Sequence, residues 1–278
     1  MAEGNSGTVS LDFTLSMNEA YCGGDITVDA QTENAYARNP NDFTALALTT
    51  YTFSVGEITK TVSVDIIGDT DMELDEDFRV SLSSASAPAS IVDSAALGTI
   101  INDDDNGYIW TGAVDSNWEN GGNWSNGSTA PPTDGTEPVG FNGSCSNCDV
   151  TISGDDPDVK AWLMFSDYTG TITQVGGDTI TVGNGHWRQA GGTFVGGSGQ
   201  ILIDSGLLHI YSGSFSSTSG ELIFGRPHYG AYGAYDVPQF ELGSAASFAH
   251  NNGKLSLRSC AGYADPGPNE LSFDSNLT

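Results

Sequence analysis

Apolar and polar residues alternate in short runs through the first hundred positions of the chain. The runs occupy residues 8–16, 25–30, 51–55, 59–67, 77–84 and 98–101. A period of two places every second side chain on the same face of a strand, and turn residues separate these runs. Short alternating strands at this spacing are typical of a β-sandwich, which we predict for residues 3–105.

The pattern changes after Asn106-Gly107, where we place a domain boundary. From about residue 149 short apolar runs recur every ten residues or fewer, with Gly at almost every corner. No stretch of the chain keeps a helical period, so the predicted class is all-β. We predict a sandwich in residues 1–106 and a Gly-rich, β-helix-like β-solenoid in residues 107–278. A second jelly-roll-like sandwich is the alternative for the second part.

Acidic residues outnumber basic ones by 36 to 8, which gives a formal net charge of −28. Nucleic-acid binding needs a basic surface, and anionic lipid would repel this chain, so we expect neither partner. No apolar run approaches the roughly 20 residues of a membrane helix, so membrane insertion is not expected. No signal peptide is visible before the first motif, which suggests a cut fragment or a mature chain.

Two acidic segments lie in the first domain, at residues 68–78 and 102–105. Carboxylates that lie this close raise one another's pKa unless a cation lies between them. Ca²⁺ accepts about 6–8 oxygen ligands from flexible loops. We therefore predict a calcium-dependent domain, and the alternative is an ordinary solvated acidic loop.

Four segments of this domain together resemble the Calx-β domain: EGNSGT at 3–8, NDF at 41–43, the segment 53–84, and GTIINDDD at 98–105. This family includes regulatory calcium-binding domains of sodium–calcium exchangers and repeats of bacterial surface proteins. The resemblance implies an Ig-like sandwich that binds Ca²⁺ between loops at one end. Position by position, it implies eight ligands: Glu3, Asp42, Asp69, Asp71, Glu73, Glu76, Asp103 and Asp104. Gly68 and Asn102 stand where other members can carry acids, which implies fewer or weaker sites.

The family also has an apolar-alternating strand before the Glu-Gly-Asn motif, and here only Met1-Ala2 precede it. Truncation explains this, but so does donation of a strand by another copy. The C-terminal ELSFDSNLT alternates at Leu271 and Phe273 and could supply that strand through Leu271 to Thr278. Such a head-to-tail contact would generate a filament.

Cys145 and Cys148 have the spacing of half a zinc site, but no second pair follows them. A short-range disulfide in an exported protein fits better, because a structural zinc site needs four ligands. The pairing of Cys22 and Cys260 stays open.

The Trp-rich segment from residue 108 to 124 resembles the opening of β-helical segments in bacterial autotransporter-like surface proteins. We expect Trp110, Trp118 and Trp124 to cap the solenoid. Other aromatic residues could stack on sugar rings or pack between coils: Trp162, Trp187, Tyr229, Tyr232 and Tyr235.

No catalytic constellation is evident, and the acidic cluster at residues 155–158 reads as a turn, so we do not predict an enzyme. The sequence predicts a bacterial extracellular or cell-surface structural or adhesive protein that Ca²⁺ stiffens. Its expected partners are further copies, neighbouring domains or surface glycans. The alternative is a carbohydrate-binding module of a larger secreted enzyme or adhesin.

Overall fold

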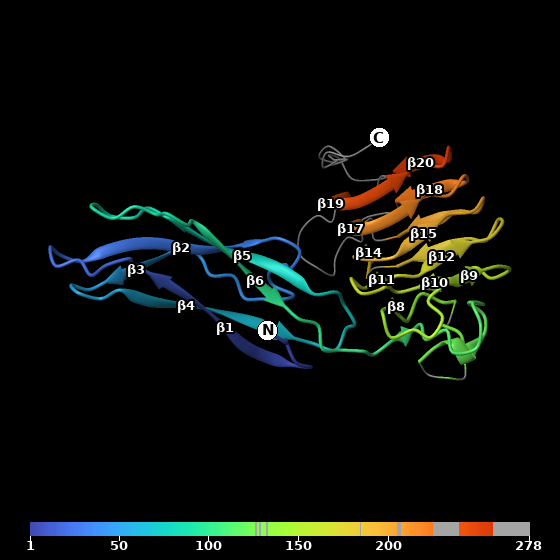
Figure 1. Ribbon diagram of the computed structural model, residues 1–278, viewed down its shortest axis with the longest axis horizontal. Coiled ribbons are helices and arrows are strands. Elements are labelled where there is room, and N and C mark those ends of the chain that lie inside the picture. Colours follow the sequence, from blue (N-terminus) through green and yellow to red (C-terminus); the bar gives the residue numbers. More distant parts are fainter. Residues whose placement is uncertain are drawn as a thin grey trace, which may run out of the picture. The chain divides into compact units, whose positions relative to one another are not determined.

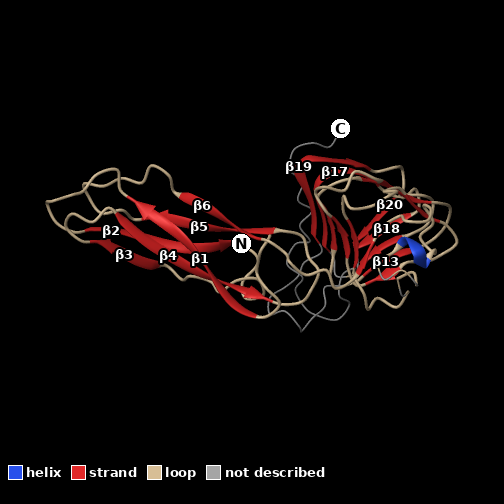
Figure 2. Ribbon diagram, turned by 60° about the horizontal axis from the view of Figure 1, so that its bottom comes forward, coloured by secondary structure: helices blue, strands red, loops and turns tan. Residues whose placement is uncertain are grey.

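A computed structural model describes residues 1–257 except 126, 128, 132, 184, 205–206 and 225–238. The chain divides into two compact units, Met1–Asp105 and Asn106–Thr278, called here the N-terminal and C-terminal units. Strands make up nearly all regular structure of the described residues, and one 3₁₀ turn, Gly121–Asn123, is their only helix (Figure 2). The predicted all-β class is confirmed. The described part holds no helix that is long and apolar enough to cross a membrane.

The N-terminal unit is a sandwich of two antiparallel sheets (Figure 1). One sheet contains β1 (Gly7–Ser16) and β4 (Thr59–Gly68). The other has the order β3 (Thr49–Phe53), β2 (Ile26–Asn34), β5 (Glu76–Ser83) and β6 (Ala95–Ile100).

The core between these sheets follows the predicted alternation. Val62, Val64 and Ile66 on β4 are buried, as is every second residue of β5 from Glu76 to Val80. The ring of Phe43 stacks on that of Phe78, with centroids 4.6 Å apart. The alternation therefore sets which face of each strand is inside.

The C-terminal unit is a solenoid in which every pairing between named strands is parallel. Residues in register on successive coils lie about 21 to 25 positions apart through the middle of the solenoid, and 31 to 33 apart where Tyr108 pairs with Val139 and Glu221 with Lys254. Each coil therefore contains several of the short runs seen in the sequence. Jelly-roll sheets pair antiparallel, so the alternative of a second sandwich is wrong.

The strands of the solenoid form two groups. The first has the order β10 (Asp158–Val159), β13 (Ile180–Val182), β16 (Ile201–Ile203), β18 (Glu221–Phe224) and β20 (Lys254–Leu257). The second has the order β7 (Tyr108–Ile109), β8 (Val139–Phe141), β11 (Trp162–Met164), β14 (Trp187–Gln189), β17 (Leu207–Ser216), β15 (Thr193–Val195), β12 (Thr171–Gln174) and β9 (Val150–Ile152), and β19 (Gln239–Ala249) pairs with β17.

Aromatic rings stack along the inside of the coils. Trp162 and Trp187 are partners in register on β11 and β14, their centroids are 4.6 Å apart, and both are 0% exposed. Trp118 stacks on the other side of Trp162 at 5.4 Å. The predicted sugar-stacking role of Trp162 and Trp187 is therefore wrong, because neighbouring coils already cover these rings.

The first residues of the C-terminal unit form a compact Trp cluster around one buried amide. Trp110 and Trp118 both pack edge-to-face on Trp124, at 5.1 and 4.8 Å. Asn123 is 0% exposed, and its Oδ1 accepts bonds from the backbone of Val114 at 2.9 Å and of residue 115 at 3.0 Å. Its Nδ2 donates to Asp115 Oδ1 at 2.6 Å, so this amide joins the turns of the cluster.

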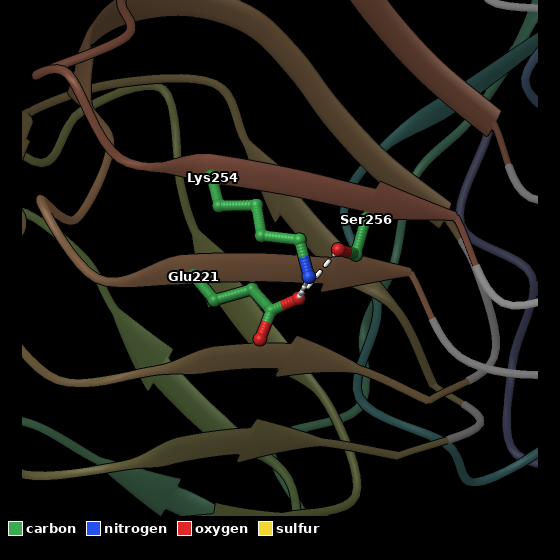
Figure 3. Close-up of polar contacts among 3 residues, drawn as sticks. All are labelled: Glu221, Lys254 and Ser256. Atoms are coloured by element: carbon green, nitrogen blue, oxygen red, sulfur yellow. Dashed lines mark hydrogen bonds and ion pairs between the residues drawn. The ribbon is translucent and has the colours of Figure 1, made fainter.

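Cys145 and Cys148 form a disulfide, as predicted, so the zinc alternative is wrong. The outer surface of the last two strands of the first group carries a cross-strand ion pair, in which Lys254 Nζ lies 2.6 Å from Glu221 Oε1 (Figure 3). Ser256 donates a hydrogen bond to the same oxygen. Several predicted features lie outside the described residues: Tyr229, Tyr232, Tyr235, Cys260 and the segment 271–278.

Candidate metal centre

Four segments of the N-terminal unit converge where β4 and β6 end. They are residues 3–5 before β1, the loop around Asp42, the β4–β5 loop and the residues that follow β6. The backbone positions two of these segments directly, because Ile67 N donates to Asp42 O at 3.0 Å and Glu3 N donates to Ile101 O at 3.3 Å. Acids that are far apart in sequence are thereby brought together.

The convergence produces two carboxylate clusters. Within each cluster, one oxygen from every residue lies within 4.8 Å of the others. One cluster contains Glu3, Asp103 and Asp104, and the other contains Asp42, Glu73 and Glu76. Closely spaced carboxylate oxygens on loops are the ligands that Ca²⁺ prefers. Six of the eight predicted ligands therefore lie in positions that suit a divalent cation.

Glu3 experiences the charge of both clusters. It is only 7% exposed, and its pKa is raised from 4.5 to about 8. Burial is the largest cause, followed by the charges of Asp69 and Glu73 and then those of Asp104 and Asp42. Asp69, which neither cluster includes, therefore still acts on this site, and the protein alone does not neutralise the charge gathered there.

Asp104 has the surroundings that suit a cation best. It is 6% exposed, and burial raises its pKa first, with contributions from Asp103 and Asp69. Its Oδ1 accepts a hydrogen bond from Asn5 Nδ2, whereas its Oδ2 is buried without a hydrogen-bond partner among the described residues. A buried carboxylate oxygen without a donor is costly, and a bound cation would remove that cost.

Backbone amides hold several of these carboxylates in place. Gly4 N donates to Asp103 Oδ1 at 2.9 Å, and Arg38 N donates to Asp42 Oδ2 at 2.5 Å. Asp69 Oδ1 accepts a bond from the backbone of Asp71 at 2.7 Å. Asp71 itself is exposed and belongs to neither cluster, so the structure gives it the weakest position of the eight predicted ligands.

Asn102 has a function that the sequence did not reveal. Its Oδ1 accepts a bond from Glu73 N at 3.2 Å, and its Nδ2 donates to the carbonyl of Asp104 at 2.7 Å. An Asp at this position could not make the second bond, because a carboxylate has no donor. Asn102 therefore joins the two acidic loops. The position needs a side chain that both donates and accepts, which explains why it holds an amide although other members of the family can carry an acid there.

Gly68 is also explained by the structure. A Cβ at this position would lie 1.9 Å from the carbonyl oxygen of Gly4, so no acidic side chain fits there without displacing the first segment. The absence of an acid at Gly68 therefore reflects the close approach of two backbones.

Comparison with known protein families matches residues 3–105 to the Calx-beta domain model. No curated protein matched the chain. Among solved structures, the chain is similar to an apo-form Calx CBD1 domain, with 20% identity over 37% of this chain and 88% of that one and a TM-score of 0.31. It is also similar to the calcium binding domain CBD12 of CALX1.1, with 21% identity over 42% of this chain and 45% of that one and a TM-score of 0.35. The Calx-beta resemblance predicted from the motifs is thus confirmed for residues 3–105, the part of the chain that matches this domain model.

Proposed function

We propose that the N-terminal unit binds Ca²⁺ through the two carboxylate clusters. The buried Asp104 Oδ2, which has no hydrogen-bond donor among the residues that the structure describes, is the observation that carries this proposal. Asp69 lies close enough to raise the pKa of Glu3 and of Asp104 and would join the ligand set, and Asp71 would contribute least.

Calcium would act by ordering the end of the sandwich. Without a cation the carboxylates repel one another, and the loops that carry them are held apart. A cation bound between them replaces that repulsion with attraction and joins four segments of the chain. Because the unfolded chain does not gather these residues, binding stabilises the folded state by mass action.

We propose further that the chain is a bacterial extracellular or cell-surface protein with a structural or adhesive function. The Cys145–Cys148 disulfide supports an oxidising compartment. The solenoid and the sandwich supply rigid modules, and the Trp-rich segment resembles the opening of bacterial surface proteins. Self-association, neighbouring domains and surface glycans are the partners that we propose, and head-to-tail strand donation would make the assembly a fibre.

A carbohydrate-binding module gains no support from the aromatic residues that suggested it. Two of them, Trp162 and Trp187, are fully buried, and the other three lie outside the described residues. We therefore do not propose sugar stacking as the function.

Calorimetric titration of the full chain with CaCl₂, after dialysis against a chelator, tests the calcium proposal. We expect saturable binding that Mg²⁺ does not reproduce, because Mg²⁺ demands a stricter octahedral geometry. Electron microscopy of the same samples with and without Ca²⁺ tests the structural role. Absence of binding heat, with equal melting temperatures in Ca²⁺ and in chelator, would rule out the calcium site.

A further inference from the structure

The two carboxylate clusters lie on segments that remain connected beyond the sheet. We call the cluster of Glu3, Asp103 and Asp104 the first cluster and that of Asp42, Glu73 and Glu76 the second cluster. β5 and β6 pair as far as Glu76 and Ile100, where their ladder ends. The segment before β5 carries Glu73, and the segment after β6 carries Asp103 and Asp104. Side-chain hydrogen bonds continue the connection between these two segments.

Asn102 takes part in this connection with both its side chain and its backbone. Its Oδ1 accepts a bond from Glu73 N at 3.2 Å, and its own N donates to Asp75 Oδ1 at 3.1 Å. Its Nδ2 donates to the carbonyl oxygen of Asp104 at 2.7 Å. Because a carboxamide is planar, fixing its oxygen at Glu73 also fixes its nitrogen at Asp104. One half-buried side chain thereby positions the backbone of a residue in each cluster.

The clusters also act on each other through their charges. The pKa of Glu3, in the first cluster, is raised in part by Glu73 and Asp42 of the second cluster. A cation in one cluster neutralises part of the negative charge that attracts a cation to the other cluster. Charge alone would therefore make the second ion bind more weakly than the first. A favourable coupling between the clusters has to come from the loops that carry them.

We propose that Asn102 couples the two clusters, so that filling one cluster with Ca²⁺ preorganises the other. This inference rests on the proposed calcium function and adds its regulation. The first cluster shows its need for a cation directly, since Asp104 Oδ2 is buried without a hydrogen-bond partner among the described residues. When this cluster is filled, the backbone that follows β6 is fixed, and Asn102 transmits its position to Glu73.

The coupling lowers the cost of ordering the second loop. An ion that binds to a loop already held in its bound conformation loses less free energy to ordering than one that binds to a mobile loop. Coupling between two sites is reciprocal, so an ion in the second cluster favours the first cluster to the same degree. Asn102 is therefore a positioning residue for both clusters.

Calcium titration calorimetry of the full chain tests the coupling through a cycle of variants. Glu73→Gln impairs the second cluster and Asp104→Asn the first, and both keep the backbone groups that Asn102 contacts. The coupling ratio is the product of the two stepwise association constants of the wild type, divided by the product of the association constants of these two variants. Asn102→Ala, introduced into all three chains, should lower this ratio at least about fivefold, the lower end for coupled sites. The repulsion between ions is the same in both backgrounds and cancels.

Asn5→Ala is the matched control. The Asn5 amide donates to Asp104 Oδ1 and so bonds within the first cluster, and its loss should weaken binding but leave the coupling ratio unchanged. Asn102→Leu, which has a similar volume and neither donor nor acceptor, replaces the alanine variant if that chain fails to fold. A ratio that Asn102→Ala leaves unchanged overturns the proposal, because a merely structural residue lowers all affinities alike. A single ion per wild-type chain overturns it too, whereas a complete absence of calcium binding would overturn the proposed function as well.

Amide hydrogen exchange follows the transmission directly. In Glu73→Gln, Ca²⁺ fills the first cluster, and exchange of the backbone amide at residue 73 should still slow, because its acceptor on Asn102 is held more firmly. The same amide should show no response to Ca²⁺ when Asn102→Ala is added. Equal exchange rates with and without Ca²⁺ in Glu73→Gln, in a sample that binds the ion, would overturn the coupling and leave the calcium site in place.

Discussion

The acidic end of the N-terminal unit and the Trp cluster of the C-terminal unit place their carboxylates in opposite electrostatic surroundings. Both contain carboxylates in loops that join distant parts of a β-structure. In the Trp cluster, Asp115 accepts bonds from Asn117 N and from the side chains of Asn120 and Asn123, which lower its pKa. In the N-terminal unit, Glu3 and Asp104 face other carboxylates, and their pKa values are raised.

The difference follows from the residues that accompany each acid. The segment from 115 to 123 supplies several Asn side chains, whose amides can donate to a carboxylate. The acidic end contributes mostly further acids, and its two amides, Asn5 and Asn102, donate to residue 104. An acid surrounded by amides needs no ion, whereas an acid surrounded by acids does.

Chelation of Ca²⁺ should produce the largest effect and should affect only one unit. At a free concentration one thousand times the dissociation constant, the ion stabilises the folded state by about 4 kcal/mol. For a domain of roughly 100 residues this corresponds to a melting-temperature change on the order of 15–30 °C. Differential scanning calorimetry of the full chain should show one transition moving with EDTA and one that stays in place. Two transitions that move together would contradict the contrast between the units.

Asn123→Ala should destabilise the C-terminal unit with no dependence on Ca²⁺. The substitution removes the acceptor of the part-buried hydrogen bonds from the backbone amides of residues 114 and 115, and each such loss costs about 1 kcal/mol. We expect only the calcium-independent transition to fall. Asn147→Ala is the matched control, because this exposed side chain accepts a single bond from the backbone of Asp149 among the described residues.

The effect of Asp104→Asn on the melting temperature of the N-terminal unit should have opposite signs in chelator and in Ca²⁺. In chelator it should raise the melting temperature of the N-terminal unit by a few degrees, because it removes a buried charge that lacks full compensation. In Ca²⁺ it should lower that temperature and weaken binding at least tenfold, because a ligand is lost. The two melting curves with and without Ca²⁺ should therefore approach each other. A variant that loses stability equally in both conditions would show that Asp104 is merely structural.

The two units should also differ in their response to pH without Ca²⁺. Glu3 has a folded-state pKa of about 8 against an ordinary 4.5, so its contribution to stability is complete below pH 4.5 and is lost as the pH rises through 8. Asp115 has a lowered pKa, so its contribution is present above its ordinary value and is lost only in acid. Raising the pH from 5 to 9 should therefore lower the N-terminal melting temperature through Glu3, and none of the Asp115 contribution is lost in that range. A flat N-terminal profile would mean that Glu3 is ionised throughout.

Asp71→Asn should have the smallest effect. This side chain is exposed and lies outside both clusters, so we expect less than a threefold change in calcium affinity and a melting temperature close to that of the wild type. Titration calorimetry of this variant beside Asp104→Asn sharpens the difference between the buried and the exposed acids.

Alternation and acid density predicted the sandwich and most of the site. Period-two patterning identified the buried face of β4, and the family motifs selected the acids that converge. Asn102 and Gly68 were understood only from the structure. Asn102 matters because its side chain bonds to the backbone of residues 73 and 104, and Gly68 matters because the backbone of residue 4 lies against its Cα. Both contacts join residues that are far apart in the sequence, so no local sequence pattern predicts them.

The solenoid was predictable in kind but not in period. Short runs with Gly at the corners indicated coils. The number of residues per coil depends on which strands pair, and the pairing of Trp162 with Trp187 is visible only in the structure. The same pairing buries these two rings, so sequence could not separate an inward Trp from an exposed one. A β-strand with three residues gives too short an alternation to assign its faces, as β11 with three buried residues shows.

Calcium titration calorimetry at pH 7, performed in two buffers that differ in ionisation enthalpy, tests the central claim most directly. Because Glu3 has a pKa of about 8 without the ion, binding should release about one proton as its carboxyl becomes a ligand. Asp104→Asn should abolish or severely weaken that binding. Titrations with no binding heat, or binding of equal strength in Asp104→Asn, would contradict the assignment of this end of the sandwich as a calcium site.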